Sequence, residues 1–371
     1  SPGMYSSHDG FMTPYHIAHL GSFAIHGAGT ITIEASAVEA RGRITPEDVG
    51  IWKDEHIEGI TSLVSTLKTM AAGTTIGIQI AHAGRKASDW SPYHRGPRKN
   101  PIYVTKEDNG MGWPDDVVGP SALSYDGEGG QWIVPKALTT EEVGQIKQKF
   151  LDAADRAYKC GVDYVELHSA HGYLLHSFLS PLSNKRTDQY GGSFENRTRL
   201  LLEIAKAVKT KYPNKSLWVR VSSTDFAEHV EAEGQATWNI NETVKLAPLL
   251  ADIGVDVLDC SAGGLVSIQR IKPAPAYQLP FAAAVSKLKL PNMLTGSVGI
   301  LEGATYSGEI AEKTLTEGKA HLIFLARGLL AKPSWPEEAA EKLTGVRCAG
   351  NPAYHRVHPA KKLPHTAMCT N

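Results

Sequence analysis

The sequence predicts an α/β fold, a (β/α)8 (TIM) barrel with a long lid loop after strand three. Short apolar segments alternate with amphipathic helical segments, which is typical of successive βα units. The apolar segments are nearly continuous, as expected of parallel strands buried on both faces. No G-x-G-x-x-G sequence follows the first of them, as a doubly wound dinucleotide-binding sheet would require. The barrel is therefore favoured over that sheet.

Each element follows from this alternation. Strands are expected at residues 30–38, 75–81, 163–167, 217–221, 255–260, 292–295 and 321–325. The helices between them are expected at residues 54–72, 139–160, 194–212, 239–253, 279–288 and 303–317. A further helix, at residues 13–26, needs a strand before it to complete a βα unit. We therefore expect residues 1–4 to be the end of an additional strand, the first of the barrel.

One segment, residues 86–135, interrupts the alternation. It is rich in proline, glycine and tryptophan and shows no long helix or strand period. A loop of this length is typical of an active-site lid, and its aromatic content argues against disorder. A surface decoration packed on the barrel is the alternative. We expect one barrel domain over residues 1–350 and a basic tail over residues 351–371 that extends off the barrel.

Composition excludes several classes of protein. The 371 residues hold 38 Lys and Arg against 39 Asp and Glu, so no charge excess attracts nucleic acid. The mean hydropathy is −0.22, and no apolar stretch is long enough to span a bilayer. The four cysteines are too scattered for a zinc site or a disulfide framework, which favours the cytoplasm. The chain starts at Ser1 without an initiator Met or a signal peptide, so we expect a trimmed N-terminus.

Polar residues gather at the predicted strand ends, where barrels of this kind place their chemistry. His168 and His171 are too few to hold a metal without further ligands, and we expect none. Two imidazole N–H groups suit an anionic oxygen, and Tyr173 can donate a proton beside them. The alternative is a pair of hydrogen-bonded histidines that only cap the strand.

A phosphate site is expected after the last two strands. Gly296 and Gly299 supply exposed backbone N–H groups and Arg327 a guanidinium, unless the glycines serve only as turn residues. Arg220 lies in an apolar strand and needs an anion, either Glu166 or a cofactor that develops negative charge. With the Gln79 amide, this set suits FMN, although other phosphate-bearing cofactors and sugar phosphates fit it too.

Several sequence stretches resemble the old yellow enzyme family. They are EASAV at residues 34–38, QIAHAGRK at 79–86, HSAHGYLLH at 168–176 and FLSPLSNKRTDQYGGS at 178–193, with further agreement to residue 356. The most similar subclass is the thermophilic-like one, whose fungal-type members have a similar long loop after strand three. The resemblance implies an FMN-dependent ene-reductase, which passes hydride from NAD(P)H, with NADPH the expected donor, to the β-carbon of an enone or enal.

The resemblance also implies a role for individual residues. His168 and His171 would bind the substrate carbonyl oxygen, and Tyr173 would protonate the α-carbon. Tyr5 would line the substrate pocket, and Arg356 would reach a neighbouring subunit, which implies a homodimer or a higher assembly. The cofactor would be held at its ring and its phosphate by Ala35, Gln79, Arg220, Gly296, Gly299 and Arg327.

One departure from the family leaves a second reaction open. The subclass usually has a cysteine that tunes the flavin where this sequence has Gly3, so that tuning is expected to be absent. The alternative function is a redox-neutral flavin-dependent isomerase, or a tailoring enzyme of secondary metabolism, on the same fold. A flavin-binding protein without turnover is the third hypothesis. It does not explain a proton donor, Tyr173, beside an oxyanion site.

Overall fold

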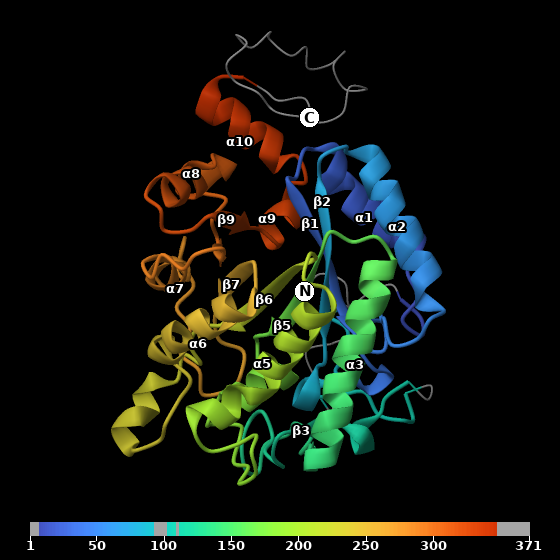
Figure 1. Ribbon diagram of the computed structural model, residues 1–371, viewed down its shortest axis with the longest axis vertical. Coiled ribbons are helices and arrows are strands. Elements are labelled where there is room, and N and C mark those ends of the chain that lie inside the picture. Colours follow the sequence, from blue (N-terminus) through green and yellow to red (C-terminus); the bar gives the residue numbers. More distant parts are fainter. Residues whose placement is uncertain (1–6, 93–101, 109–110, 347–371) are drawn as a thin grey trace.

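The core of the molecule is a curled sheet of seven parallel strands surrounded by helices (Figure 1). A computed structural model describes residues 7–92, 102–108 and 111–346. The strand order is β1-β2-β5-β6-β7-β8-β9, and every neighbouring pair is parallel. The strands are β1 (Thr30–Ala37), β2 (Thr75–Ala81), β5 (Tyr164–Ser169), β6 (Ser216–Ser222), β7 (Val257–Ser261), β8 (Leu294–Val298) and β9 (Leu322–Phe324).

Helices follow the strands around the outside of the sheet, and most of the larger helices pack against a neighbouring helix (Figure 1). This arrangement, with parallel strands and covering helices, is that of an α/β barrel. The larger helices are α1 (Pro14–Ile25), α2 (His56–Met70), α3 (Thr140–Lys159), α5 (Phe194–Lys211), α6 (Ile240–Ile253), α7 (Leu279–Ser286), α8 (Glu309–Thr316) and α10 (Trp335–Thr344). Two short helices are α4 (Leu174–Leu179) and α9 (Arg327–Ala331). Within the described ranges, no helix is long and apolar enough to cross a membrane.

Local sequence signals fix where the helices begin and end. Helix α3 begins in a capping box, in which the Thr139 hydroxyl accepts from the Glu142 N–H and the Glu142 carboxylate accepts from the Thr139 N–H. Helix α6 begins at an Asn239 cap and ends at Gly254, whose φ of +98° favours glycine. The amphipathic pattern then turns apolar residues of each helix onto the sheet.

Apolar side chains cover both faces of the strands, one set outside the sheet and the other inside it. Outward-facing strand residues such as Ile78 and Val165 pack under the helices in the main core. Inside the sheet, Tyr164 stacks on Trp218 with ring centroids 3.6 Å apart, and Phe324 contacts Trp218 edge-on at 5.8 Å. These rings fill the lower interior, so the polar side chains lie closer to the carboxyl ends of the strands.

The prediction of seven parallel strands is confirmed, with bounds that shift by at most a few residues. The predicted helix at residues 303–317 is wrong in part. Positive φ angles at Thr305, Tyr306 and Gly308 interrupt it, so that a 3-10 turn precedes α8. Helices α4, α9 and α10 were not predicted. The expected first strand, Gly3, Tyr5, Arg356 and the tail at residues 351–371 lie outside the described residues.

The long segment after β2 packs as a folded layer wherever the structure describes it. It contains the 3-10 turn Pro114–Asp116 and two short paired strands, β3 (Val118–Gly119) and β4 (Lys136–Ala137). The Trp113 indole donates to the Arg41 carbonyl, and the Arg43 guanidinium lies 4.7 Å from the centre of the Trp113 ring. A small apolar cluster joins the segment to the barrel and to one side of Tyr173.

Candidate active site

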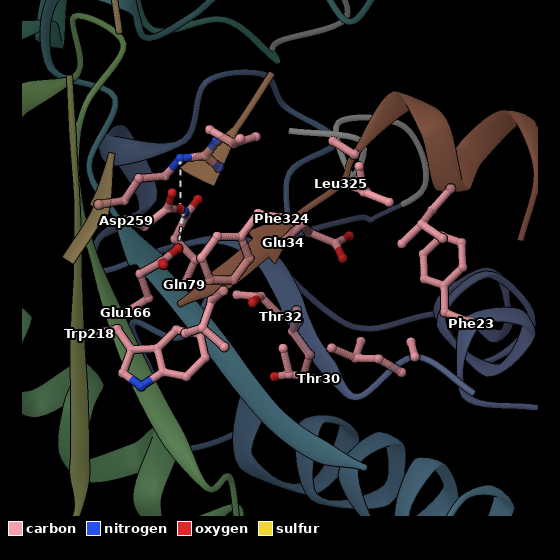
Figure 2. Close-up of a pocket in the computed structure, with 18 of the residues that line it drawn as sticks. Phe23, Thr30, Thr32, Glu34, Gln79, Glu166, Trp218, Asp259, Phe324 and Leu325 are labelled. Atoms are coloured by element: carbon pink, nitrogen blue, oxygen red, sulfur yellow. Dashed lines mark hydrogen bonds and ion pairs between the residues drawn. The ribbon is translucent and has the colours of Figure 1, made fainter. Parts of the chain in front are cut away.

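A cavity of about 640 Å³ lies inside the sheet and continues outward between β1 and β9. Its size is in the ordinary range for a small-molecule or cofactor site. The strands deliver polar side chains to it from their carboxyl ends, where the notable ones are Gln79, Glu166, His168, His171, Tyr173, Arg220 and Asp259. Figure 2 shows Gln79, Glu166 and Asp259 together on one wall, and Thr30, Thr32 and Glu34 beside them.

His168 is the last but one residue of β5 and is 2% exposed. The Ala170 N–H donates to its Nδ1 over 3.3 Å, which leaves the proton on Nε2. Burial, with Arg220 nearby, holds the pKa of His168 well below its ordinary value. The neutral ring therefore has one N–H to offer to a ligand.

His171 stands in the loop after β5 with a positive φ of 60°. Its backbone N–H donates to the Ser222 hydroxyl over 2.9 Å, and its Nε2 lies 2.7 Å from the Ser261 hydroxyl. Burial lowers the pKa of His171 as well, with Arg220 the next cause. The Ser261 hydroxyl also lies 3.3 Å from Gln278 Oε1 and has one proton to donate. When it donates to His171 Nε2, the proton of the neutral ring is on Nδ1, and when it donates to Gln278, that proton is on Nε2. The centroids of the His168 and His171 rings are 5.2 Å apart.

Tyr173, two residues after His171, completes this group. Its ring centroid is 4.9 Å from that of His168, and the two planes are nearly perpendicular. Burial raises the pKa of Tyr173 above its ordinary value, so the hydroxyl keeps its proton. His168, His171 and Tyr173, which the sequence put forward together, thus line the same cavity.

No role was predicted for Lys86 from the sequence, but its side chain holds the backbone at His171 in place. Its ammonium donates to the carbonyls of His171 and Gly264 over 2.9 and 3.0 Å. It also lies 5.2 Å from the centre of the Tyr173 ring. The signal for it was present, because Lys86 ends the QIAHAGRK stretch beyond β2. Ser222 and Ser261, at the ends of β6 and β7, were likewise not singled out for the contacts that they make with His171.

Arg220 pairs with a different carboxylate from the one that the sequence suggested. Arg220 Nε lies 3.2 Å from Asp259 Oδ2, whereas Glu166 accepts a hydrogen bond of 2.7 Å from Gln79 Nε2. Strand register explains this, because Gln79 is directly opposite Glu166 and Arg220 directly opposite Asp259. No hydrogen-bond partner within the described ranges is present for the terminal nitrogens of Arg220. These donors are suited to an acceptor on a ligand.

The proposed phosphate residues lie on neighbouring strands, but they do not line the cavity itself. Gly296 and Gly299 are in and just after β8, and Arg327 begins α9, exposed to solvent. A Cβ on Gly296 would lie 2.2 Å from the Phe324 ring, and Gly299 has a φ of +115°. The lining residues beside them are Val298 and Ala326. Ala35 is buried on β1 next to the lining residue Glu34.

These residues fit a flavin mononucleotide. A flat ring needs an apolar slot with donors and acceptors at one end, and the cavity has Gln79 and Arg220 there. A phosphate needs close backbone approach and a cation, which Gly299 and Arg327 can supply beyond β8 and β9. Within the described ranges, no group of three or more His, Cys, Asp or Glu side chains is placed to hold a metal ion.

Comparisons with known proteins identify a family and several relatives. Residues 2–345 match the NADH:flavin oxidoreductase / NADH oxidase family. An NADH:flavin oxidoreductase of Gibberella zeae is 43% identical over 320 residues, which are 85% of this chain and 74% of that protein. An NADPH dehydrogenase of Bacillus subtilis is 42% identical over 342 residues, which are 92% of this chain and 88% of that protein.

Solved structures show the same fold at lower sequence identity. Morphinone reductase in complex with tetrahydroNAD has a TM-score of 0.68 and 24% identity, and covers 94% of this chain and 86% of its own. A 2-naphthoyl-CoA reductase complex has a TM-score of 0.75 and 23% identity, and covers 90% of this chain and 47% of its own.

Proposed function

The chain belongs to the NADH:flavin oxidoreductase / NADH oxidase family, and on this basis we propose that it is an FMN-dependent ene-reductase. It is an NADPH-dependent flavin oxidoreductase, a reading that its NADPH dehydrogenase relatives support. The proposed reaction reduces the C=C bond of α,β-unsaturated carbonyl compounds with hydride from NAD(P)H. We place the chain in the thermophilic-like subclass of the old yellow enzyme family, among fungal-type members.

One observation carries the proposal. Two neutral imidazoles and a protonated phenol line one cavity, with ring centroids about 5 Å apart. Neutral N–H donors stabilise negative charge that develops on a carbonyl oxygen, and removing one such donor costs on the order of 10²–10³ in rate. His168 and His171 therefore bind the carbonyl oxygen and polarise the alkene.

Tyr173 supplies the proton. Reduction at the β-carbon leaves an enolate, whose α-carbon must be protonated. The raised pKa of Tyr173 keeps its hydroxyl protonated, and the hydroxyl belongs to the same cavity as the two histidines. A site that only bound a flavin would need neither the donor pair nor this phenol.

Bound FMN supplies the hydride transfer itself. Gln79, Arg220 and Ala35 bind its ring, and the Arg220 guanidinium favours negative charge there. Gly296, Gly299 and Arg327 hold its phosphate. Beyond the described residues, Tyr5 lines the substrate pocket, and Arg356 of one protomer reaches the site of the next in a homodimer or higher assembly. The long segment at residues 86–135 acts as a lid through its contact with Tyr173.

A turnover assay tests the proposed function. NADPH, the purified protein and 2-cyclohexenone are incubated without oxygen, and cyclohexanone is quantified by gas chromatography. We expect one cyclohexanone for each NADPH consumed. A product of unchanged mass, formed without loss of NADPH, would favour the redox-neutral isomerase instead.

A further inference from the structure

Four polar side chains from four neighbouring strands form a layer of the cavity wall that also includes His168 and His171. Gln79 donates to Glu166, and Arg220 pairs with Asp259, at the distances given above. Glu166 and Asp259 are each 2% exposed. Glu166 Oε2 and Asp259 Oδ1 have no hydrogen-bond partner within the described part of the chain. The layer thus has two buried carboxyl groups and one cation.

The charges around this layer do not supply a second cation. On β1, Glu34 is paired with His16 at 2.9 Å. Below, the Tyr164 hydroxyl is hydrogen-bonded to the hydroxyls of Thr30 and Thr32. Above, His168 and His171 are neutral. Two ionised carboxylates against one guanidinium would leave one negative charge buried and unpaired, which is costly.

We propose that Glu166 is a positioning residue of the flavin site, and that it shares one proton with Asp259 beneath the Arg220–Gln79 end of the flavin ring. Two consequences follow for the ring. Because Glu166 accepts from Gln79 Nε2, the carbonyl oxygen of the Gln79 amide is directed to the ring as an acceptor. Because the pair retains one proton, Arg220 faces one negative charge and not two. This inference rests on FMN binding in the proposed function, but not on the substrate.

The proton of the pair responds to charge on the ring. At pH values above the apparent pKa at which the pair loses its one proton, both carboxyls are ionised. Added negative charge beside Arg220 raises that pKa, so within this pH interval the pair takes up one proton from solvent and forms one O–H bond. Burial raises the pKa of both carboxyls, and for Glu166 the neighbouring Asp259 raises it further. Arg220 opposes both shifts.

Two measurements test the shared proton. The first is the infrared absorption of the flavin-free protein at neutral pH, where we expect the C=O stretch of a protonated carboxylic acid. The band loses intensity in Glu166→Gln, and also in Asp259→Asn because the remaining carboxyl then pairs alone with Arg220. Burial raises the pKa of Asp48 to about 7, so its carboxyl contributes a component that both variants keep. Glu34→Gln is the matched control, since it removes a buried carboxylate of the same cavity that already has a partner, and it leaves the band in place.

The second measurement is the midpoint potential of bound FMN as a function of pH. In the wild type we expect a pH interval in which one more proton is taken up per two electrons than in Glu166→Gln. Asp259→Asn loses the extra proton too, and stands alone as the test if Glu166→Gln does not fold. An unchanged proton count in both variants, or an acid band whose intensity neither variant lowers, would overturn the proposal. A holoenzyme that shows the extra proton but does not reduce 2-cyclohexenone contradicts only the proposed function.

Discussion

Tyr173 is the residue whose chemistry can be isolated most cleanly, because only its hydroxyl needs to be removed. We expect Tyr173→Phe to lower the rate of cyclohexanone formation by about 10²–10⁴, the usual contribution of a positioned proton donor. The affinity for the carbonyl compound should not change, because His168 and His171 remain. The measurement is single-turnover product formation at saturating 2-cyclohexenone.

Tyr158→Phe is the matched control for this change. The Tyr158 hydroxyl donates to the Ser216 carbonyl outside the cavity, so its loss costs stability but not proton delivery. Equal product rates in Tyr173→Phe and the wild type would remove Tyr173 from the mechanism.

Because His168 and His171 are neutral, we predict that the affinity for a carbonyl ligand does not change with pH. Burial lowers the pKa of His168 and His171 from the ordinary value of 6.5, so both rings are already neutral at pH 6 and stay neutral as pH rises. The dissociation constant of the uncharged ligand cyclohexanone should be flat from pH 6 to 9, measured by titration of the flavin spectrum. A change in affinity centred near pH 6.5 would show that one ring titrates in the ordinary way.

At the scale of the elements, β8 and β9 must approach closely at Gly296. A Cβ there would lie 2.2 Å from the Phe324 ring, so Gly296→Ala should destabilise the protein by about 1–3 kcal/mol and weaken FMN binding. Gly144→Ala is the control, because no atom lies within 4 Å of its added Cβ near the beginning of α3. Alanine there is expected to be neutral or stabilising. Urea unfolding and FMN titration of both variants check the difference.

The long segment after β2 depends on Trp113 for its attachment. Trp113→Ala removes the hydrogen bond to Arg41 and the stacking of Arg43, which together contribute about 1–2 kcal/mol. Amide exchange should rise across residues 111–137, and KM for 2-cyclohexenone should rise with it. Val134→Ala, at a side chain 64% exposed in the same segment, should change neither. Faster exchange with an unchanged KM would contradict the lid role.

The strands were predictable and the polar pairings were not. Buried parallel strands such as β2 appear in the sequence as short runs of apolar residues, so their positions can be predicted from these runs. Helices α4, α9 and α10 are short or follow another helix, so the strand–helix alternation does not reveal them. The pairing of Arg220 with Asp259 depends on the register between β6 and β7, which cannot be deduced from a single sequence.

At the scale of the whole molecule, cofactor binding should stabilise the fold. FMN at a hundred times its dissociation constant should raise the free energy of unfolding by about 2.7 kcal/mol. Riboflavin, which lacks the phosphate, should bind more weakly if Gly296, Gly299 and Arg327 hold that group. Thermal unfolding with each ligand checks this prediction. Arg327→Ala should reduce the difference in affinity between FMN and riboflavin. Equal affinity for FMN and riboflavin would contradict the phosphate site.

The recognisable chemistry of the site came from contiguous sequence. His168, His171 and Tyr173 fall within six consecutive residues at the end of β5, so their proximity could be predicted from the sequence. Lys86 reaches the same part of the site from the 3-10 turn after β2, 85 residues before His171, whose carbonyl it binds. Such contacts follow from the closure of the sheet and become visible only in three dimensions.

The central claim is that reducing equivalents pass from NADPH through bound flavin to an activated alkene, and one experiment without oxygen tests it most directly. The purified holoenzyme is mixed with NADPH while the flavin absorption band is recorded, and 2-cyclohexenone is added when the band has bleached. We predict bleaching by NADPH followed by full return of the band on addition of the enone. A band that NADPH does not bleach, or that stays bleached in the presence of the enone, would contradict the account.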